Sequence, residues 1–87
     1  MVRWRDLIVY CMSEYNERWD DVVSYVPEDG KWLDYLFDDT YGFIEGEPFT
    51  LWSKGRVYFP MVFDGSEWVA SISRNPDGVI TKHLGSW

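Results

Sequence analysis

The stretch Arg56–Arg74, RVYFPMVFDGSEWVASISR, decides the fold because it predicts a β-hairpin. Asp64-Gly65 separates two runs rich in Val, Phe, Tyr, Trp and Ile, and this arrangement is the strongest short-range hairpin signal. A two-residue type I′ loop at Asp64-Gly65 would fix the register, because Phe63 would then pair with Ser66 and the remaining residues would pair in order.

This register gives the hairpin two apolar faces. One face pairs Phe63 with Ser66, Met61 with Trp68, Phe59 with Ala70 and Val57 with Ile72. The other face pairs Val62 with Glu67, Pro60 with Val69, Tyr58 with Ser71 and Arg56 with Ser73. A small domain needs to bury only one face of a sheet, so the surplus of apolar side chains predicts a surface that binds a partner.

The composition is that of one folded domain spanning residues 1–87. The aromatic fraction is 20%, with six Trp and six Tyr, and such large rings allow a short chain to bury enough apolar area. Disordered chains are poor in aromatic and β-branched residues, so we expect an ordered protein.

The net charge of −7 is distributed unevenly. Residues 14–47 contain eleven acidic side chains against Arg18 and Lys31, which gives this segment a net charge of −9. An acidic field repels phosphate, so direct binding to DNA or RNA is disfavoured. The acids would suit a partner with a basic surface, or they could simply keep a helical half of the protein soluble.

The N-terminal half is predicted to be helical over residues 1–38. Apolar residues recur at helical spacing from Trp4 to Val26, which predicts a long amphipathic helix over residues 3–25. Asn16 could instead cap a second helix, so the segment contains either one helix or two. Pro27 ends the segment. A short helix, Lys31–Asp38, is expected after the turn at 28–30, with Trp32, Leu33, Leu36 and Phe37 on its inner side.

Residues 47–87 are predicted to form an antiparallel sheet of three or four strands, following a loop at Asp39–Pro48. The expected strands are Phe49–Ser53, Arg56–Phe63, Glu67–Arg74 and a weaker Val79–Leu84. Pro60 conflicts with a central strand because proline has no backbone N–H to donate. A bulge at Pro60, or a short or missing first strand, would resolve the conflict.

The predicted fold class is therefore α+β, with N-terminal amphipathic helices packed on one face of an antiparallel meander. We expect the helices to cover the face with Val57, Phe59, Met61, Phe63, Trp68, Ala70 and Ile72. The opposite face would then be the candidate partner-binding surface, unless the helices or the loop cover it. Its predicted anchors are Phe49, Leu51, Tyr58, Val62 and Val69, and the acidic residues Asp20, Asp21, Asp38 and Asp39 would steer a basic partner toward it.

Catalytic and metal-binding patterns are weak. Cys11 is the single cysteine and falls on an apolar stripe, where a small buried side chain is expected. His83 is the single histidine and is expected at the surface. Asp38, Asp39, Glu45 and Glu47 resemble a calcium loop only superficially, because the spacing of an EF-hand is missing. We predict no enzyme activity, no cofactor and no metal site.

The segments Glu47–Trp52, Arg56–Pro60, Asp64–Val69 and Arg74–Pro76 resemble small proteins carried by bacteriophages and prophages. The likeness covers about half of the chain and contains no catalytic motif. It implies an accessory protein that binds and modulates one protein of the host, such as a restriction or CRISPR effector.

The sequence thus predicts a non-catalytic module for protein–protein interaction in the cytoplasm, since no signal peptide or membrane-spanning run is expected. An acidic inhibitor that imitates nucleic acid and a self-associating structural protein, including a homodimer, are the alternatives. The identity of the partner and the oligomeric state stay open.

Overall fold

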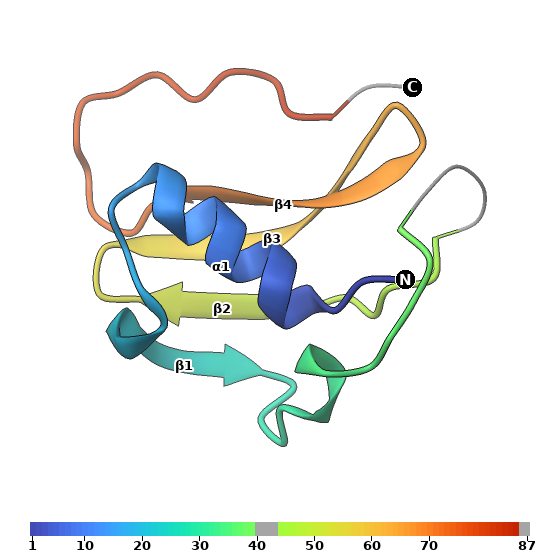
Figure 1. Cartoon of the computed structure of the whole chain (residues 1–87). Coiled ribbons are helices and arrows are strands. Elements are labelled where there is room, and N and C mark those ends of the chain that lie inside the picture. Colours follow the sequence, from blue (N-terminus) through green and yellow to red (C-terminus); the bar gives the residue numbers. More distant parts are fainter. Residues whose placement is uncertain (40–43, 86–87) are drawn as a thin grey trace.

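The computed structural model describes residues 1–39 and 44–85 and shows an α+β fold with an antiparallel sheet. One helix, α1 (Trp4–Glu14), crosses one face of four strands: β1 (Val22–Val26), β2 (Thr50–Ser53), β3 (Arg56–Phe63) and β4 (Ser66–Ser73) (Figure 1). The strands lie in the order β1-β2-β3-β4, so the sheet is a meander with β1 and β4 at its edges. The predicted fold class is confirmed at this level, with one helix where several were expected.

The hairpin has the predicted register at all eight pairs, from Phe63 with Ser66 to Arg56 with Ser73. The two turn residues have positive φ angles, 52° at Asp64 and 80° at Gly65. A type I′ turn requires both angles to be positive, and its twist matches that of the flanking strands. The Asp-Gly dipeptide therefore determined the alignment of the two longest strands.

The short strand β2 resolves the conflict at Pro60. Leu51 pairs with Tyr58 and Trp52 with Val57, so β2 begins too late to lie beside Pro60. Pro60 pairs with Val69 of β4 on its other side. Within an antiparallel pair, the N–H groups of alternate residues point to opposite sides of the strand. The missing N–H of Pro60 would point toward the side that β2 leaves open, which confirms the alternative of a short first strand.

The predicted long helix is wrong beyond Glu14. The chain leaves α1 through Asn16, which has a φ of 58°, and a 3₁₀ turn, η1 (Trp19–Asp21), leads into β1. Valine is β-branched and favours strands, and four apolar residues in five positions suit either a helix or a strand. The register of β1 with β2 shifts between Val22 and Ser24, which places Val23 in a bulge.

Two further elements differ from the predictions. The expected helix Lys31–Asp38 is a single 3₁₀ turn, η2 (Lys31–Leu33), and Leu36 is exposed although Trp32, Leu33 and Phe37 are buried. The expected strand Val79–Leu84 has no sheet partner in the part of the chain that the structure describes. The predicted loop at Asp39–Pro48 contains residues 40–43, which lie outside the described residues.

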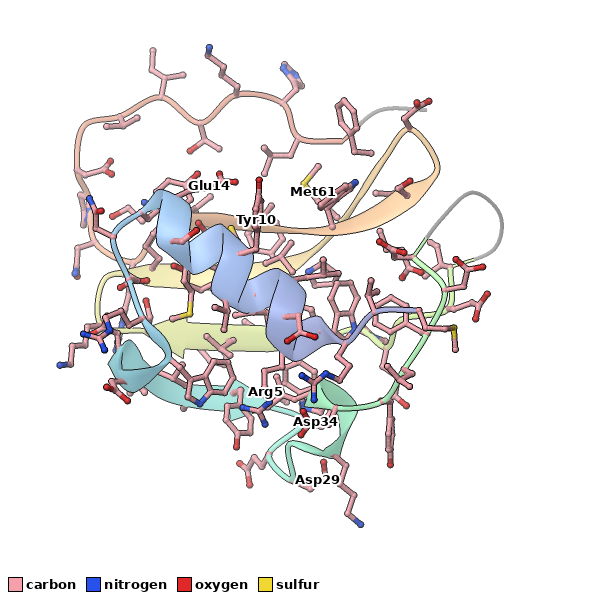
Figure 2. All side chains as sticks on the ribbon, viewed as in Figure 1. Arg5, Tyr10, Glu14, Asp29, Asp34 and Met61 are labelled. Atoms are coloured by element: carbon pink, nitrogen blue, oxygen red, sulfur yellow. The ribbon has the colours of Figure 1, made fainter. Side chains whose placement is uncertain are left out.

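An ion pair connects α1 to the chain that follows η2. The guanidinium of Arg5 donates to both carboxylate oxygens of Asp34 at 2.8 and 3.0 Å, and Figure 2 shows the two side chains pointing toward each other. This contact holds the pKa of Asp34 below its usual value. Both side chains are partly exposed, so the pair adds little to stability.

The two faces of the sheet have exchanged the roles that the sequence predicted. The inner face, defined as the face under α1, carries Leu51, Ser53, Arg56, Tyr58, Pro60, Val62, Glu67, Val69 and Ser71. Leu51 and Tyr58 have no exposed surface, and they belong to a core cluster with Trp4, Ile8, Cys11, Met12, Trp32, Leu33, Phe37 and Phe49. Of the predicted anchors, Phe49, Leu51 and Tyr58 are core residues and Val69 packs against the core, whereas Val62 is only partly buried. The face predicted to be covered carries the exposed side chains of Phe63, Trp68 and Ile72.

Candidate functional site

The outer face of the sheet is uncharged. Pairing places on it the side chains of Ser24, Val26, Thr50, Trp52, Val57, Phe59, Met61, Phe63, Ser66, Trp68, Ala70 and Ile72. Phe63 is 53% exposed, Trp68 40% and Ile72 39%, while Val57, Phe59, Met61 and Trp52 are partly buried by their neighbours. The solvent face of an antiparallel sheet is ordinarily polar, so an uncharged aromatic face is a candidate interaction surface.

The inner face holds the charged residues instead. Glu67 is buried, and its carboxylate accepts hydrogen bonds from the backbone N–H groups of Glu45 and Gly46, both at 2.9 Å. Its own backbone N–H donates to the carbonyl of Asp39. Trp4 Nε1 donates to the carbonyl of Glu47 at 3.0 Å. The hydrogen bonds of the buried Glu67 carboxylate and of Trp4 thus hold the segment 45–47 against the N-terminal end of α1.

A second polar network lies at the other end of the inner face. The carboxylate of Glu17 accepts hydrogen bonds from the hydroxyls of Ser53 and Tyr58, both at 2.6 Å, and from the backbone N–H of Gly55. Burial, followed by the hydrogen bond to Glu17, raises the pKa of Tyr58 far above its ordinary value of about 10. The protonated phenol is therefore the form that the fold requires.

Stability is expected to fall at high pH because of Tyr58. Its pKa is raised in the folded state, so its contribution is complete below about pH 10 and is lost as the pH rises above that. The free energy of unfolding should decrease by about 1.4 kcal/mol per pH unit in this range from this group alone. Urea unfolding from pH 9 to 11.5 measures the slope. The Tyr58→Phe variant should show a smaller slope, and an unchanged slope would contradict this assignment.

An apolar hollow of about 580 Å³ lies at the hairpin end of the sheet. Most of its lining is apolar, and Glu67 is the one charged lining residue among those that the structure describes. The lining residues are Ile44, Gly46, Pro48, Phe59, Pro60, Met61, Val62, Glu67, Leu84 and Gly85. Val62, which the sequence predicts as an anchor, is partly exposed here, while Val69 packs against the core. The hollow borders the outer face through Phe59 and Met61 and extends its apolar surface.

The four acidic residues predicted to steer a partner lie at opposite ends of β3. Asp20 is exposed and Asp21 accepts from the backbone N–H of Arg18, and the carbonyl of Asp21 accepts from Lys54 between β2 and β3. Asp38 and Asp39 lie near the start of β4, where the carbonyl of Asp39 meets Glu67. The structure does not bring them into one cluster.

Within residues 1–39 and 44–85, no group of three or more His, Cys, Asp or Glu side chains could hold a metal ion. Cys11 is buried, as the sequence predicts, and burial raises the pKa of its thiol. None of the described helices is long and apolar enough to cross a membrane.

Comparison with protein-family models, curated proteins and solved structures finds no match to this chain. The candidate site therefore depends on the geometry of the sheet alone. The sequence analysis missed Phe63, Trp68 and Ile72 as candidate site residues because it placed their strongly apolar face under the helices.

Proposed function

We propose that this protein is a non-catalytic module that binds another protein through the outer face of its sheet. The supporting observation is that this face is broad, aromatic and uncharged while α1 covers only the inner face. Monomeric proteins rarely expose contiguous apolar patches of this kind without a partner. Phe63, Trp68 and Ile72 are the anchors, since large exposed side chains at the centre of an interface contribute most of the binding energy.

The partner is a protein whose apolar contact surface is bordered by basic residues. Asp20, Asp21, Glu28 and Asp29 flank the two ends of β1, at one edge of the outer face. The net charge of −7 makes two copies of this chain repel each other, which disfavours self-association through this face. The acids would raise the association rate with a basic partner at low salt.

The test is affinity capture followed by measurement of the dissociation constant of the captured protein. The Trp68→Ser and Phe63→Ser variants should each weaken binding by about 30-fold or more, because a central anchor contributes about 2 kcal/mol or more. Tyr10→Ser is the matched control, because Tyr10 is an exposed aromatic residue on α1 (Figure 2). The melting temperatures of these variants should be nearly equal to that of the wild type.

Two results would contradict this function. Tyr10→Ser could weaken the affinity for the captured protein as much as the outer-face substitutions do, or neither outer-face substitution could change that affinity. The acidic nucleic-acid mimic differs in its salt dependence, because its affinity would fall steeply between 50 and 500 mM salt. That the partner is a protein of a bacterial host, as the resemblance to phage proteins implies, stays a prediction.

A further inference from the structure

The strand β4 lies at the edge of the sheet and leaves backbone groups without a partner strand. Because Phe63 and Ser66 exchange the hydrogen bonds that close the hairpin, the N–H groups of Trp68, Ala70 and Ile72 point toward β3. Those of Val69, Ser71 and Ser73 point outward. The outward N–H of Glu67 donates to Asp39, but the structure gives the next three amides no acceptor within residues 1–39 and 44–85.

The chain after β4 runs back alongside this edge without pairing to it, as the last described segment in Figure 1 shows. The backbone N–H of Val79 donates to Asp77 Oδ1 at 3.0 Å, in the turn where the segment begins. A Cβ added to Gly85 would lie 2.7 Å from the carbonyl oxygen of Val62, so the far end of the segment touches β3 closely. The first end is thus ordered by a local turn and the far end contacts β3, while Ile80 between them is 88% exposed.

A groove of about 610 Å³ separates β4 from this segment. Ser71, Ile72 and Ser73 line one wall, and Ile80, Lys82 and Leu84 are among the residues of the other. The wall formed by β4 offers an extended backbone edge, and the distance from residue 69 to residue 73 is about 13–14 Å at the rise of a β-strand. The groove therefore has the form of a slot for one additional strand.

The groove is basic although the protein is acidic. Its charged lining residues are Arg56, Arg74 and Lys82 against Asp77. Arg56 donates to the hydroxyl and carbonyl of Ser71, and Arg74 donates to the carbonyl of Ser53 at 2.8 Å. These acceptors are neutral, and none of the three cations forms an ion pair within the described residues. The guanidinium of Arg56 also lies over the ring of Tyr15, 3.7 Å from its centroid, but no carboxylate of the described residues neutralises any of the three charges.

We propose that this groove binds an extended, acidic peptide segment of another protein, which adds to β4 as a fifth strand. The outward N–H groups of Val69, Ser71 and Ser73 would supply the main-chain hydrogen bonds, and the cations would select carboxylate side chains. Strand β1 of a second copy fits less well, because it is attached to a whole sheet, and entry of that sheet would displace the segment 79–84. Apart from Ile72, the groove is separate from the outer face.

The test is selection from a randomised heptapeptide library, followed by backbone hydrogen exchange measured by NMR. In the free protein, the amides of Val69, Ser71 and Ser73 should exchange faster than those of Trp68, Ala70 and Ile72, which pair with β3. Selected peptides should be rich in Asp and Glu, and their binding should slow exchange at the three outward amides. Outward amides already protected in the free protein would overturn the proposal, because the groove would then be closed.

Charge reversal gives a second measurement. Lys82→Glu should weaken the affinity for the selected peptide by about tenfold or more, whereas the same change at the remote exposed Lys31 should have little effect. Three results would overturn the proposed peptide site. The selected peptides could lack acidic residues, Lys31→Glu could weaken their binding as much as Lys82→Glu does, or the library could yield no binding peptide. Peptide binding lost in Trp68→Ser and retained in Lys82→Glu would place the ligand on the outer face, so failure of this site is distinguishable from failure of the proposed function.

Discussion

The Leu51→Ala variant is expected to lose about 2–5 kcal/mol of unfolding free energy, the range for large-to-small substitutions in a packed core. Leu51 has no exposed surface and lies in the cluster under α1 with Trp32, Phe49 and Tyr58. Its removal leaves a cavity that rigid aromatic neighbours fill poorly. In a domain of this size, such a loss is a large part of the total stability.

Phe63→Ala is the matched control for Leu51→Ala. Phe63 also lies in a strand of the sheet, but on the outer face, with about half of its surface exposed. Its replacement should change the free energy of unfolding by about 1 kcal/mol or less. Urea or guanidinium titration followed by circular dichroism measures both variants. If Phe63→Ala were the more damaging substitution, the assignment of the two faces would be wrong.

The second large effect is expected at Glu67. Glu67→Ala removes the acceptor for the backbone N–H groups of Glu45 and Gly46, and hydrogen bonds to a charged group contribute about 1.5–3 kcal/mol each. We expect a total loss of about 3 kcal/mol or more. Gly46 also lies so close to Trp4 that an added Cβ would be 2.5 Å from the ring. Movement of this segment would therefore loosen the contact with α1.

Glu67→Gln provides the comparison, since the amide keeps one acceptor oxygen at nearly the same size. Its stability should lie between those of the wild type and Glu67→Ala. Hydrogen exchange at the amides of Glu45 and Gly46 reports the contact directly, and it should accelerate strongly in Glu67→Ala. Unchanged exchange at these two amides would show that the carboxylate does not hold the segment.

The hairpin was predictable because local chemistry determines it. Asp64-Gly65 accepts the positive φ angles of its turn, and the period of two then aligns every pair of β3 and β4. The choice between faces was not local. Tyr58 and Leu51 are buried because α1 and the aromatic residues Trp32 and Phe49 meet above them, and those contacts join segments far apart in the sequence.

The errors in the helical half have a similar cause. Val22, Tyr25 and Val26 satisfy helical spacing, but the β-branched valines favour a strand, and pairing with the free edge of β2 decides in favour of the strand. The segment Val79–Leu84 has strand composition but lies at an edge where the groove separates it from β4. The composition of this segment could indicate a preference for extended backbone. Whether the segment pairs with β4 depends on its position, which the turn at Asp77 and the contact of Gly85 with Val62 determine.

The sequence predicted that one apolar face of the sheet would be open, but it assigned this role to the face that α1 covers. The expectation that one helical layer leaves one apolar face open holds, because α1 covers only the inner face. The helices were expected on the strongly apolar face, but α1 covers the face that carries Arg56 and Glu67. Glu67 is buried because its carboxylate accepts two backbone hydrogen bonds, and Arg56 donates to the hydroxyl of Ser71; no pattern in the sequence reveals these contacts.

Carbene footprinting of the native protein, resolved to single residues by mass spectrometry, tests the assignment of the two faces most directly. We predict strong labelling at Phe63, Trp68 and Ile72 and protection at Leu51 and Tyr58, with labelling of all five after denaturation. The reverse pattern in the native protein, with Leu51 and Tyr58 labelled and Phe63 and Trp68 protected, would contradict the account.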